Sequence, residues 1–343
     1  MFEGVELRQM PLTMKSVRTQ VESFLHVNDL LLDNDLDYYA GLFLDDEMMA
    51  GGGLSNDIIK CIAVSANARE MNLSGSLISH LRSAGMARGY SNLYAFTKPQ
   101  NRELFEHLAF NVIAESPKAI LCESSSHGIE TYCRDLKKEQ GSGVQGCIVM
   151  NCNPVTLGHL YLIETAASQV DRLHIICVQE DASLFPYEVR YNLLKQATSH
   201  LDNVVVHRGS RYVLSKATFP SYFIKEPSEV ALNQIKLDLD LFVRYIVPAL
   251  NITVRFVGTE PLDVLTNNYN TLMKEMLPNH GVRVEELQRK EDAGGVISAS
   301  RVRQLLADDR IAEASQLLPP CVVEFLGTEQ GSRVVERIKK SQR

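Results

Sequence analysis

Two segments of the chain carry residue types that suit phosphate chemistry, and the first is the nine-residue run from 151 to 159. It reads Asn151-Cys152-Asn153-Pro154-Val155-Thr156-Leu157-Gly158-His159. Asn-Pro is typical of a turn, and Gly158 has no side chain, so a nucleotide can approach the backbone closely. A helix that begins here presents free N–H donors to phosphate oxygens. Thr156 and His159 are three residues apart and can face one phosphate. The alternative is an N-capped helix whose histidine faces the helix.

The second segment lies near the end of the chain. It reads Ile297-Ser298-Ala299-Ser300-Arg301-Val302-Arg303 and precedes a helix-like apolar run. Ser298 and Ser300 can cap a helix and donate to phosphate, and Arg303 can hold a leaving pyrophosphate. The alternative is an ordinary serine-capped helix.

Two further cations, Lys225 and Arg190, could each reach a phosphate from the end of a strand or helix. Such residues are more often solvated surface charges, and the sequence favours that interpretation for both.

The elements that must position these residues alternate between strands and helices. Strand-like runs occupy 146–150, 173–178, 203–207, 253–258 and 282–286, and helix-like runs include 160–168, 188–198 and 239–250. This alternation predicts a doubly wound parallel sheet with helices on both faces. Ligands of such sheets bind outside the carboxyl ends of the strands, which is where both segments fall.

The first part of the chain has a different pattern. Strand-like runs at 38–44, 47–52, 57–64, 93–97 and 110–114 are mixed with helix-like runs. Leu73, Leu77, Ile78, Leu81 and Ala84 form one apolar helical face. The polar, glycine-containing stretch between the two patterns predicts a first domain at 1–135, a linker at 136–144 and a second domain at 145–343.

Bulk composition excludes several classes of protein. The 343 residues carry a net charge of −7, which argues against nucleic acid and anionic membranes as partners. No apolar run approaches the roughly 18–20 residues that span a bilayer, and acidic residues near the N-terminus argue against a secretion signal. The seven scattered cysteines contain no CxxC pair and indicate reduced thiols, neither disulfides nor a metal site. We therefore expect a cytoplasmic enzyme.

The two phosphate segments resemble known motifs. Residues 156–159 resemble the (H/T)xGH motif of the nucleotidyltransferase superfamily, and residues 297–303 resemble its ISxTxxR-type element. Those enzymes cleave a nucleoside triphosphate between its α and β phosphates. The order of elements in residues 1–135 resembles a GNAT-type acyltransferase. The resemblance implies an α/β protein in which a GNAT-like α+β domain precedes a Rossmann-like nucleotidyltransferase domain.

Further runs resemble the citrate lyase ligase family, which joins the same two domains in the same order. They lie at 146–150, 185–188, 217–225, 255–261 and 297–306. The resemblance implies a ligase of citrate fermentation that consumes ATP and acetate, with Mg²⁺, and acetylates the thiol of the citrate lyase acyl carrier subunit. That carrier bears a phosphoribosyl-dephospho-CoA group. AMP and pyrophosphate are released, and citrate lyase becomes active.

The resemblance also implies roles for residues. His159, Thr156 and Arg303 are expected to act in catalysis. The expected ATP contacts are Asn151, Asn153, Pro154, Gly158, Gly258, Thr259, Glu260, Ser298 and Ser300. No dedicated protein ligand set for the metal is visible.

The GNAT-like part contains a degenerate version of the turn with which GNAT folds cradle a CoA pyrophosphate. Arg69 is present, but Asn72 and Ser74 stand where small residues are expected. We therefore expect these three residues to contact the CoA-like group of the carrier, or the domain to be mainly structural.

Two other functions share parts of this pattern. Another adenylyl- or cytidylyltransferase would use the same phosphate segments but would make a dinucleotide from a phosphomonoester. A regulatory acyl-CoA-binding protein would rely on the GNAT-like half and show no ATP–pyrophosphate exchange with acetate.

Overall fold

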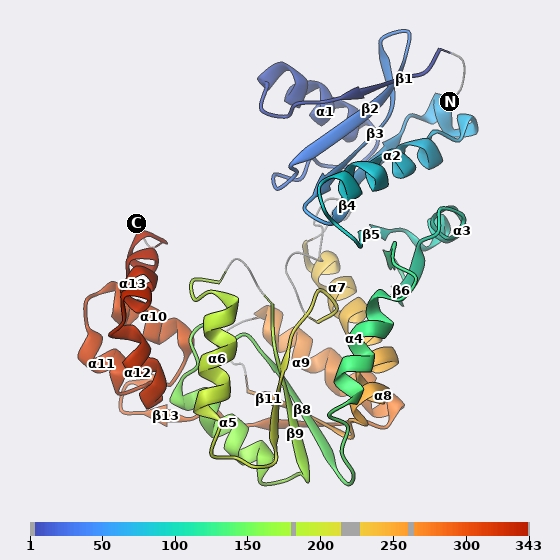
Figure 1. Cartoon of the computed structure of the whole chain (residues 1–343). Coiled ribbons are helices and arrows are strands. Elements are labelled where there is room, and N and C mark those ends of the chain that lie inside the picture. Colours follow the sequence, from blue (N-terminus) through green and yellow to red (C-terminus); the bar gives the residue numbers. More distant parts are fainter. Residues whose placement is uncertain (1–3, 180–182, 214–226, 260–263, 342–343) are drawn as a thin grey trace. The chain divides into compact units, whose positions relative to one another are not determined.

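The computed structural model describes residues 4–179, 183–213, 227–259 and 264–341. Contacts divide them into two units (Figure 1). The first holds the described residues within Met1–Thr131 and Ala217–Leu241, and the second those within Tyr132–Lys216 and Phe242–Arg343. The contact boundary thus falls before the predicted linker. The segment that includes helix α7 (Pro227–Leu241) joins the first unit, where the backbone N–H of Glu115 donates to the Asp240 carboxylate (2.8 Å).

The first unit is built on a seven-stranded mixed sheet. Its strands are β1 Glu6–Gln9, β2 Tyr38–Leu44, β3 Glu47–Ser55, β4 Ile58–Val64, β5 Tyr94–Thr97, β6 Asn111–Glu115 and β7 Ile120–Glu123. They lie in the order β1-β2-β3-β4-β5-β7-β6, and only β4 and β5 run parallel among neighbours. The strand patterns predicted five of these strands; β1 and β7 are short and were missed.

Two helices cover opposite faces of this sheet. Helix α1 (Lys15–Val27) buries Val21 and Leu25 in one apolar cluster, and α2 (Leu73–Ala87) buries its predicted apolar face in another. Neighbouring β2 residues divide between the two clusters because successive strand side chains point to opposite faces. The remaining helices are α3 Arg102–His107 and the 3₁₀ turns Ala66–Met71 and Pro99–Asn101.

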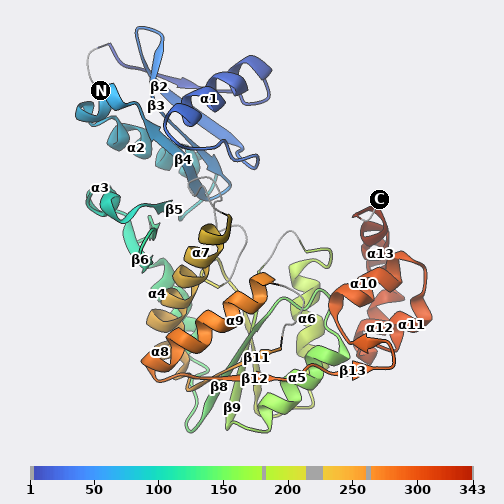
Figure 2. The same cartoon turned by 180° about the vertical axis from the view of Figure 1, so that it is seen from behind.

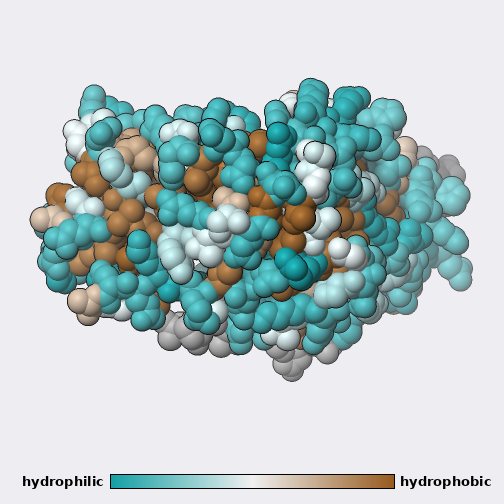
Figure 3. All heavy atoms as spheres, turned by 90° about the horizontal axis from the view of Figure 1, so that it is seen from below, coloured by the Kyte–Doolittle hydropathy of each residue, from teal (hydrophilic) through white to brown (hydrophobic). Residues whose placement is uncertain are grey.

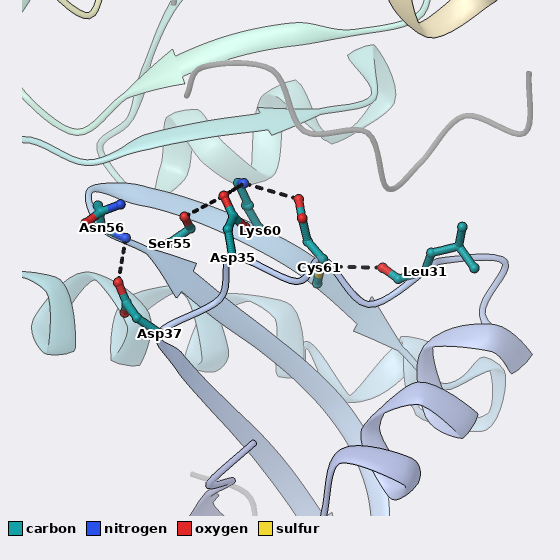
Figure 4. Close-up of polar contacts among 8 residues, drawn as sticks. Leu31, Asp35, Asp37, Ser55, Asn56, Lys60 and Cys61 are labelled. Atoms are coloured by element: carbon teal, nitrogen blue, oxygen red, sulfur yellow. Dashed lines mark hydrogen bonds and ion pairs between the residues drawn. The ribbon is translucent and has the colours of Figure 1, made fainter. Parts of the chain in front are cut away.

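Ion pairs between a buried lysine and two aspartates connect the loop between α1 and β2 to the sheet (Figure 4). Lys60 of β4 is 3% exposed, and its Nζ donates to the carboxylates of Asp35 (2.6 Å) and Asp33 (3.2 Å). Ser55 donates to the same Asp35 carboxylate. Although burial alone raises the pKa of Asp35, the hydrogen bonds from Lys60 and Ser55 leave it below its usual value.

The second unit contains the predicted parallel sheet. Its strands are β8 Gln145–Met150, β9 Arg172–Cys177, β10 Val204–Arg208, β11 Val254–Gly258 and β12 Arg283–Leu287. They are ordered β10-β9-β8-β11-β12 and are all parallel. The order reverses between β8 and β11, so the sheet has a topological switch point there. The prediction of a doubly wound α/β domain is confirmed.

Helices cover both faces of the parallel sheet (Figure 2). One face packs against α5 Leu157–Ala167 and α6 Tyr187–Ala197, and the apolar cluster beneath them extends to α10 Ala299–Ala307, α12 Pro320–Leu326 and α13 Glu329–Ser341. On the other face, Arg255 of β11 stacks on Phe242 of the π-helical turn Phe242–Ile246. The remaining elements are α4 Gly128–Lys137, α8 Val247–Leu250, α9 Val264–Met276, the 3₁₀ turn Leu277–His280, the hairpin β13 Glu291–Asp292 and β14 Gly295–Val296, and α11 Ile311–Ser315.

Three further features of the molecule are the polarity of its surface, the character of its helices and the state of its cysteines. The face drawn in Figure 3 is mostly hydrophilic, with apolar residues between the polar ones. Of the helices in the described ranges, none combines the length and apolarity that a bilayer crossing requires. All seven cysteines are free thiols, and five of them are buried.

Candidate active site

The loop after β8 occupies the switch point of the parallel sheet. It begins at Asn151, leaves the sheet between β9 and β11, and ends where α5 starts at Leu157. Crevices at such points, outside the carboxyl ends of the strands, are where doubly wound folds bind ligands. The first predicted phosphate segment therefore lies at the position that the fold favours for a ligand.

Thr156 and His159 form a reciprocal cap at the start of α5. The His159 backbone N–H donates to Thr156 Oγ1 (3.3 Å), and the Thr156 backbone N–H donates to His159 Nδ1 (3.1 Å). Thr156 Oγ1 also lies 2.9 Å from the same ring nitrogen. Thr156 is fully buried. Its hydroxyl accepts the hydrogen bond from the His159 N–H at the helix start and also contacts the imidazole, which fixes the orientation of the ring.

This cap determines the protonation of His159. A backbone N–H can only donate, so Nδ1 acts as an acceptor and a neutral ring carries its proton on Nε2. Burial, with a smaller contribution from the positive charge of Arg289, lowers the pKa of His159 to about 4. The half-buried ring is therefore neutral near pH 7, and its Nε2–H is a hydrogen-bond donor.

Fewer helix amides are free than the sequence suggested. A helix start leaves about four N–H groups without helical partners. Here the amide of Thr156 donates to Nδ1, that of His159 to Oγ1, and that of Leu157 to the Leu317 carbonyl (2.9 Å). Only the amide of Gly158 has no partner among the described residues. The prediction of several free donors is wrong, because the cap and the Leu317 carbonyl take three of them.

The second phosphate segment packs directly on the first. A Cβ placed on Gly158 would lie 2.3 Å from the carbonyl oxygen of Ile297. Ser298 caps α10 by accepting from the Arg301 N–H (3.2 Å), as the sequence predicted for a helix-capping serine. Gly158 is thus required by the close approach of residue 297, a reason that the sequence did not indicate.

Arg303 joins the two segments across 150 positions of the chain. Its Nη1 donates to the Asn153 carbonyl (2.6 Å) and its Nη2 to Ser300 Oγ (3.1 Å). The guanidinium is half-buried, and burial lowers its pKa. Pro154, which follows Asn153, is buried and its peptide bond is cis. The structure therefore places Arg303, Ser300 and the loop before His159 together.

Arg190 is the residue for which the surface interpretation is wrong. It is 1% exposed, and its guanidinium donates to the carbonyls of Asn151 (2.7 Å), Val178 (2.8 Å) and Phe185 (3.1 Å). It also donates to the Asn151 side chain (2.8 Å). Arg190 thus ties the ends of β8 and β9 together, because several carbonyls satisfy its donors out of solvent.

The asparagines of the loop are likewise held by the protein. Asn151 Nδ2 donates to Ser183 Oγ (3.2 Å), and Asn153 Oδ1 accepts from the Phe185 N–H (3.0 Å). These contacts fix the loop on which His159 and Arg303 depend.

Two of the predicted ATP contacts, Gly258 and Thr259, lie at the end of β11. Gly258 ends the strand, and its carbonyl accepts from Asn270 Nδ2 (3.1 Å). The Thr259 N–H donates to the Leu287 carbonyl (2.9 Å). Glu260 and Lys225 lie outside the described residues.

Sequence reasoning missed Arg289. A Cβ on Gly258 would lie 3.8 Å from the Arg289 side chain, and the charge of Arg289 acts on His159. The signal that could have found it is its place three residues after a predicted strand (282–286), at the end of the sheet where ligands bind.

The first unit has a separate cleft of about 430 Å³. Strands β4 and β5 pair only at their first residues, and the cleft lies farther along them. Arg69 and Ser74 line it, with Lys98 and Asn101. Asn72, at the start of α2, has φ +47°. Asparagine tolerates this left-handed conformation, so the turn forms without the expected glycine.

Comparison with known proteins gives the family. Residues 145–326 match the model of the citrate lyase ligase C-terminal domain. The chain is 39% identical over 317 residues to citrate (pro-3S)-lyase ligase of Escherichia coli (strain K12), covering 90% of this chain and 89% of the relative. It is 41% identical over 318 residues to the ligase of Klebsiella pneumoniae, covering 91% and 93%.

Among solved structures, a bifunctional NMN adenylyltransferase/ADP ribose pyrophosphatase from Francisella tularensis aligns with 59% of this chain and 53% of its own. The sequence identity is 13% and the TM-score 0.37. The identity and coverage of the two ligases are what decide the family. This chain belongs to the citrate lyase ligase family.

Proposed function

We propose that this ligase activates citrate lyase by acetylating the thiol prosthetic group of its acyl carrier subunit, using ATP and acetate. The two relatives described above are ligases of citrate lyase. In the first step, a carboxylate oxygen of acetate attacks the α-phosphorus of ATP, the bond to the β-phosphate breaks, and acetyl-adenylate and pyrophosphate form. In the second step, the carrier thiol loses its proton and attacks the acetyl carbon, and AMP leaves.

The residues at the switch point suit the first step. Acetate is ionised near neutral pH, so its attack needs no general base. It needs an aligned nucleophile and donors aimed at the charge that develops on phosphate. His159 would supply its Nε2–H and Gly158 its backbone N–H. Thr156 would act by fixing the imidazole.

The leaving pyrophosphate would be held by the second segment. Arg303 is fixed by Asn153 and Ser300, and its remaining N–H groups can donate to phosphate oxygens. Ser298 and Ser300 would add hydroxyl donors. Asn151, Asn153 and Pro154 would shape the loop beneath the phosphates, and Arg190 would hold that loop.

Adenosine is assigned to the end of β11, at Gly258, Thr259 and Glu260. Lys225 would be a further phosphate contact. Mg²⁺ would arrive with the nucleotide and would neutralise part of the charge on its phosphates. Within the described ranges, no cluster of three or more His, Cys, Asp or Glu side chains could hold a metal ion.

The observation that carries the proposal is the meeting of the two phosphate segments at Gly158 and Arg303. Its test is acetate-dependent exchange of radiolabelled pyrophosphate into ATP. We expect exchange in the wild type and a loss of roughly 10²–10³-fold in His159→Ala, as for removal of a preorganised donor. The exposed His280→Ala is the matched control. The proposal is contradicted if the exchange rate does not depend on acetate, or if His159→Ala retains the wild-type rate.

The cleft of the first unit is assigned to the CoA-like arm of the carrier. Arg69 lines the cleft and can pair with a phosphate. Ser74 offers a hydroxyl beside the turn at Asn72. Binding of dephospho-CoA to the full chain tests this assignment. We expect Arg69→Ala to weaken binding about tenfold or more. Arg18→Ala, which removes a partly exposed arginine that pairs with Glu22 on α1, should leave binding unchanged. Equal affinities of the two variants would remove the assignment.

A further inference from the structure

Arg289 lies in the segment that spans the switch point of the parallel sheet. Two residues before it, the Leu287 carbonyl accepts from the Thr259 N–H (2.9 Å). One residue after it, the Lys290 carbonyl accepts from the Ile297 N–H (2.9 Å). Arg289 is therefore bracketed by two backbone anchors, one at the end of β11 and one at the segment that precedes α10.

Side-chain contacts place this segment beside the end of β11 and beside α5. The Arg289 side chain lies next to Gly258, at 3.8 Å from the position of a Cβ there. Lys290 Nζ lies 5.9 Å from the ring centre of Tyr161 on α5. Through Lys290 and Arg289, this segment thus borders both the helix that carries His159 and the strand that ends at Gly258.

The charge of Arg289 reaches His159. It disfavours the protonated imidazole, which adds to the effect of burial on that ring. The site also has to bring a carboxylate to a phosphate, two groups of like charge that repel without a cation between them.

We propose that Arg289 binds a negatively charged oxygen of the substrates beside Gly258. Arg303 would bind the leaving pyrophosphate at the loop before α5. The inference rests on the proposed function. The shared chemistry is a negatively charged oxygen, either of the nucleotide phosphates or of the carboxylate substrate. A planar guanidinium suits both, because it can donate two parallel hydrogen bonds to either group.

Two measurements on the full chain separate the two sources. The first is the affinity for a non-hydrolysable ATP analogue by calorimetry, and the second is the KM for acetate in pyrophosphate exchange. The variants are Arg289→Ala and Arg289→Gln. Arg283→Ala is the matched control, since Arg283 lies at the opposite end of β12 and pairs with Glu285 on the surface.

If Arg289 holds phosphate, both variants bind the analogue roughly 10- to 100-fold more weakly than the control. If Arg289 holds the carboxylate, analogue affinity is unchanged and the acetate KM rises by a similar factor. Arg289→Lys should recover part of either loss. The inference is overturned if both quantities stay within about twofold of the control. Absence of exchange in the wild type would refute the proposed function instead, and the binding measurement would still decide the phosphate assignment.

Discussion

The carbonyl oxygen of Ile297 occupies the space where a side chain of Gly158 would begin, 2.3 Å from the position of its Cβ. The TxGH helix and the segment before α10 therefore touch backbone to backbone. Such an approach fixes the spacing between His159 on one segment and Arg303 on the other. Gly158 is therefore the residue at which the start of α5 contacts the segment before α10.

Gly158→Ala should separate the two segments. The obstacle is a backbone carbonyl that cannot rotate away, so we expect a loss of about 1–3 kcal/mol in the free energy of unfolding. Pyrophosphate exchange should fall by roughly 10²-fold, because small misplacements of catalytic groups are costly. Gly75→Ala on α2 is the control, since its Cβ would meet no atom closer than 3.6 Å. Wild-type exchange in Gly158→Ala would show that the spacing is unimportant.

Thr156→Val tests whether the threonine acts through His159. Valine keeps the size of the buried side chain but removes the acceptor for the His159 N–H and the hydroxyl beside Nδ1. We expect a loss of about 0.5–2 kcal/mol in stability from the missing cap, together with a lower kcat for exchange. Thr156→Ser retains the hydroxyl.

A positioning role requires rescue by the serine variant. If Thr156→Ser restores stability but not kcat, the hydroxyl is not what orients the ring. If valine leaves kcat unchanged, the backbone N–H of residue 156 alone is sufficient to hold Nδ1.

The architecture of the second unit could be predicted from the sequence because most of its parallel strands are short apolar runs that alternate with helices. The site was only partly readable. The sequence placed Thr156 and His159 at a helix start, but it could not reveal that Leu317 takes one of the amides. Such long-range contacts leave no local pattern.

Arg190 illustrates the same limit. Arginine is usually exposed, and nothing near it in sequence indicates burial. It is buried because the ends of two strands present carbonyls that need donors there. The first unit adds a different limit: β1 reads Glu-Leu-Arg-Gln and β7 reads Ile-Leu-Cys-Glu, and neither run alternates apolar and polar residues.

Arg303→Lys should act mainly on pyrophosphate. Lysine keeps the charge but cannot donate to the Asn153 carbonyl and Ser300 while also holding phosphate. We expect the KM for pyrophosphate in the exchange reaction to rise roughly tenfold or more, with a smaller effect on acetate. Arg310→Lys, which alters an exposed pair with Glu313, is the control. An acetate-specific defect in Arg303→Lys would move Arg303 away from the leaving group.

Two buried histidines should make the second unit sensitive to acid. His174 Nε2 lies 3.1 Å from Gln145 Oε1, and its Nδ1 lies 2.9 Å from His207 Nε2. This chain of bonds is satisfied by neutral rings, with the Nε2–H of His174 donating to Gln145 and that of His207 donating to His174. Burial lowers the pKa of His174 to about 3 and that of His207 to about 4.

The direction of the pH effect follows from these values. Both histidines take up protons near pH 6.5 in the unfolded chain but only near pH 3–4 in the folded one. The unfolded state therefore binds more protons as pH falls below about 6.5, and stability declines until the folded rings also titrate. Each ring should contribute a loss of about 2 kcal/mol between pH 7.5 and pH 5.

His207→Gln should remove one of these two contributions. Its amide can still donate to His174 Nδ1, so the variant should fold, and its free energy of unfolding should fall less between pH 7.5 and pH 5 than that of the wild type. Urea unfolding at the two pH values, followed by a probe in the second unit, measures the difference. His280→Gln controls for the substitution itself. If His207→Gln and the control lose equal stability on acidification, the buried pair is not the source of the acid sensitivity.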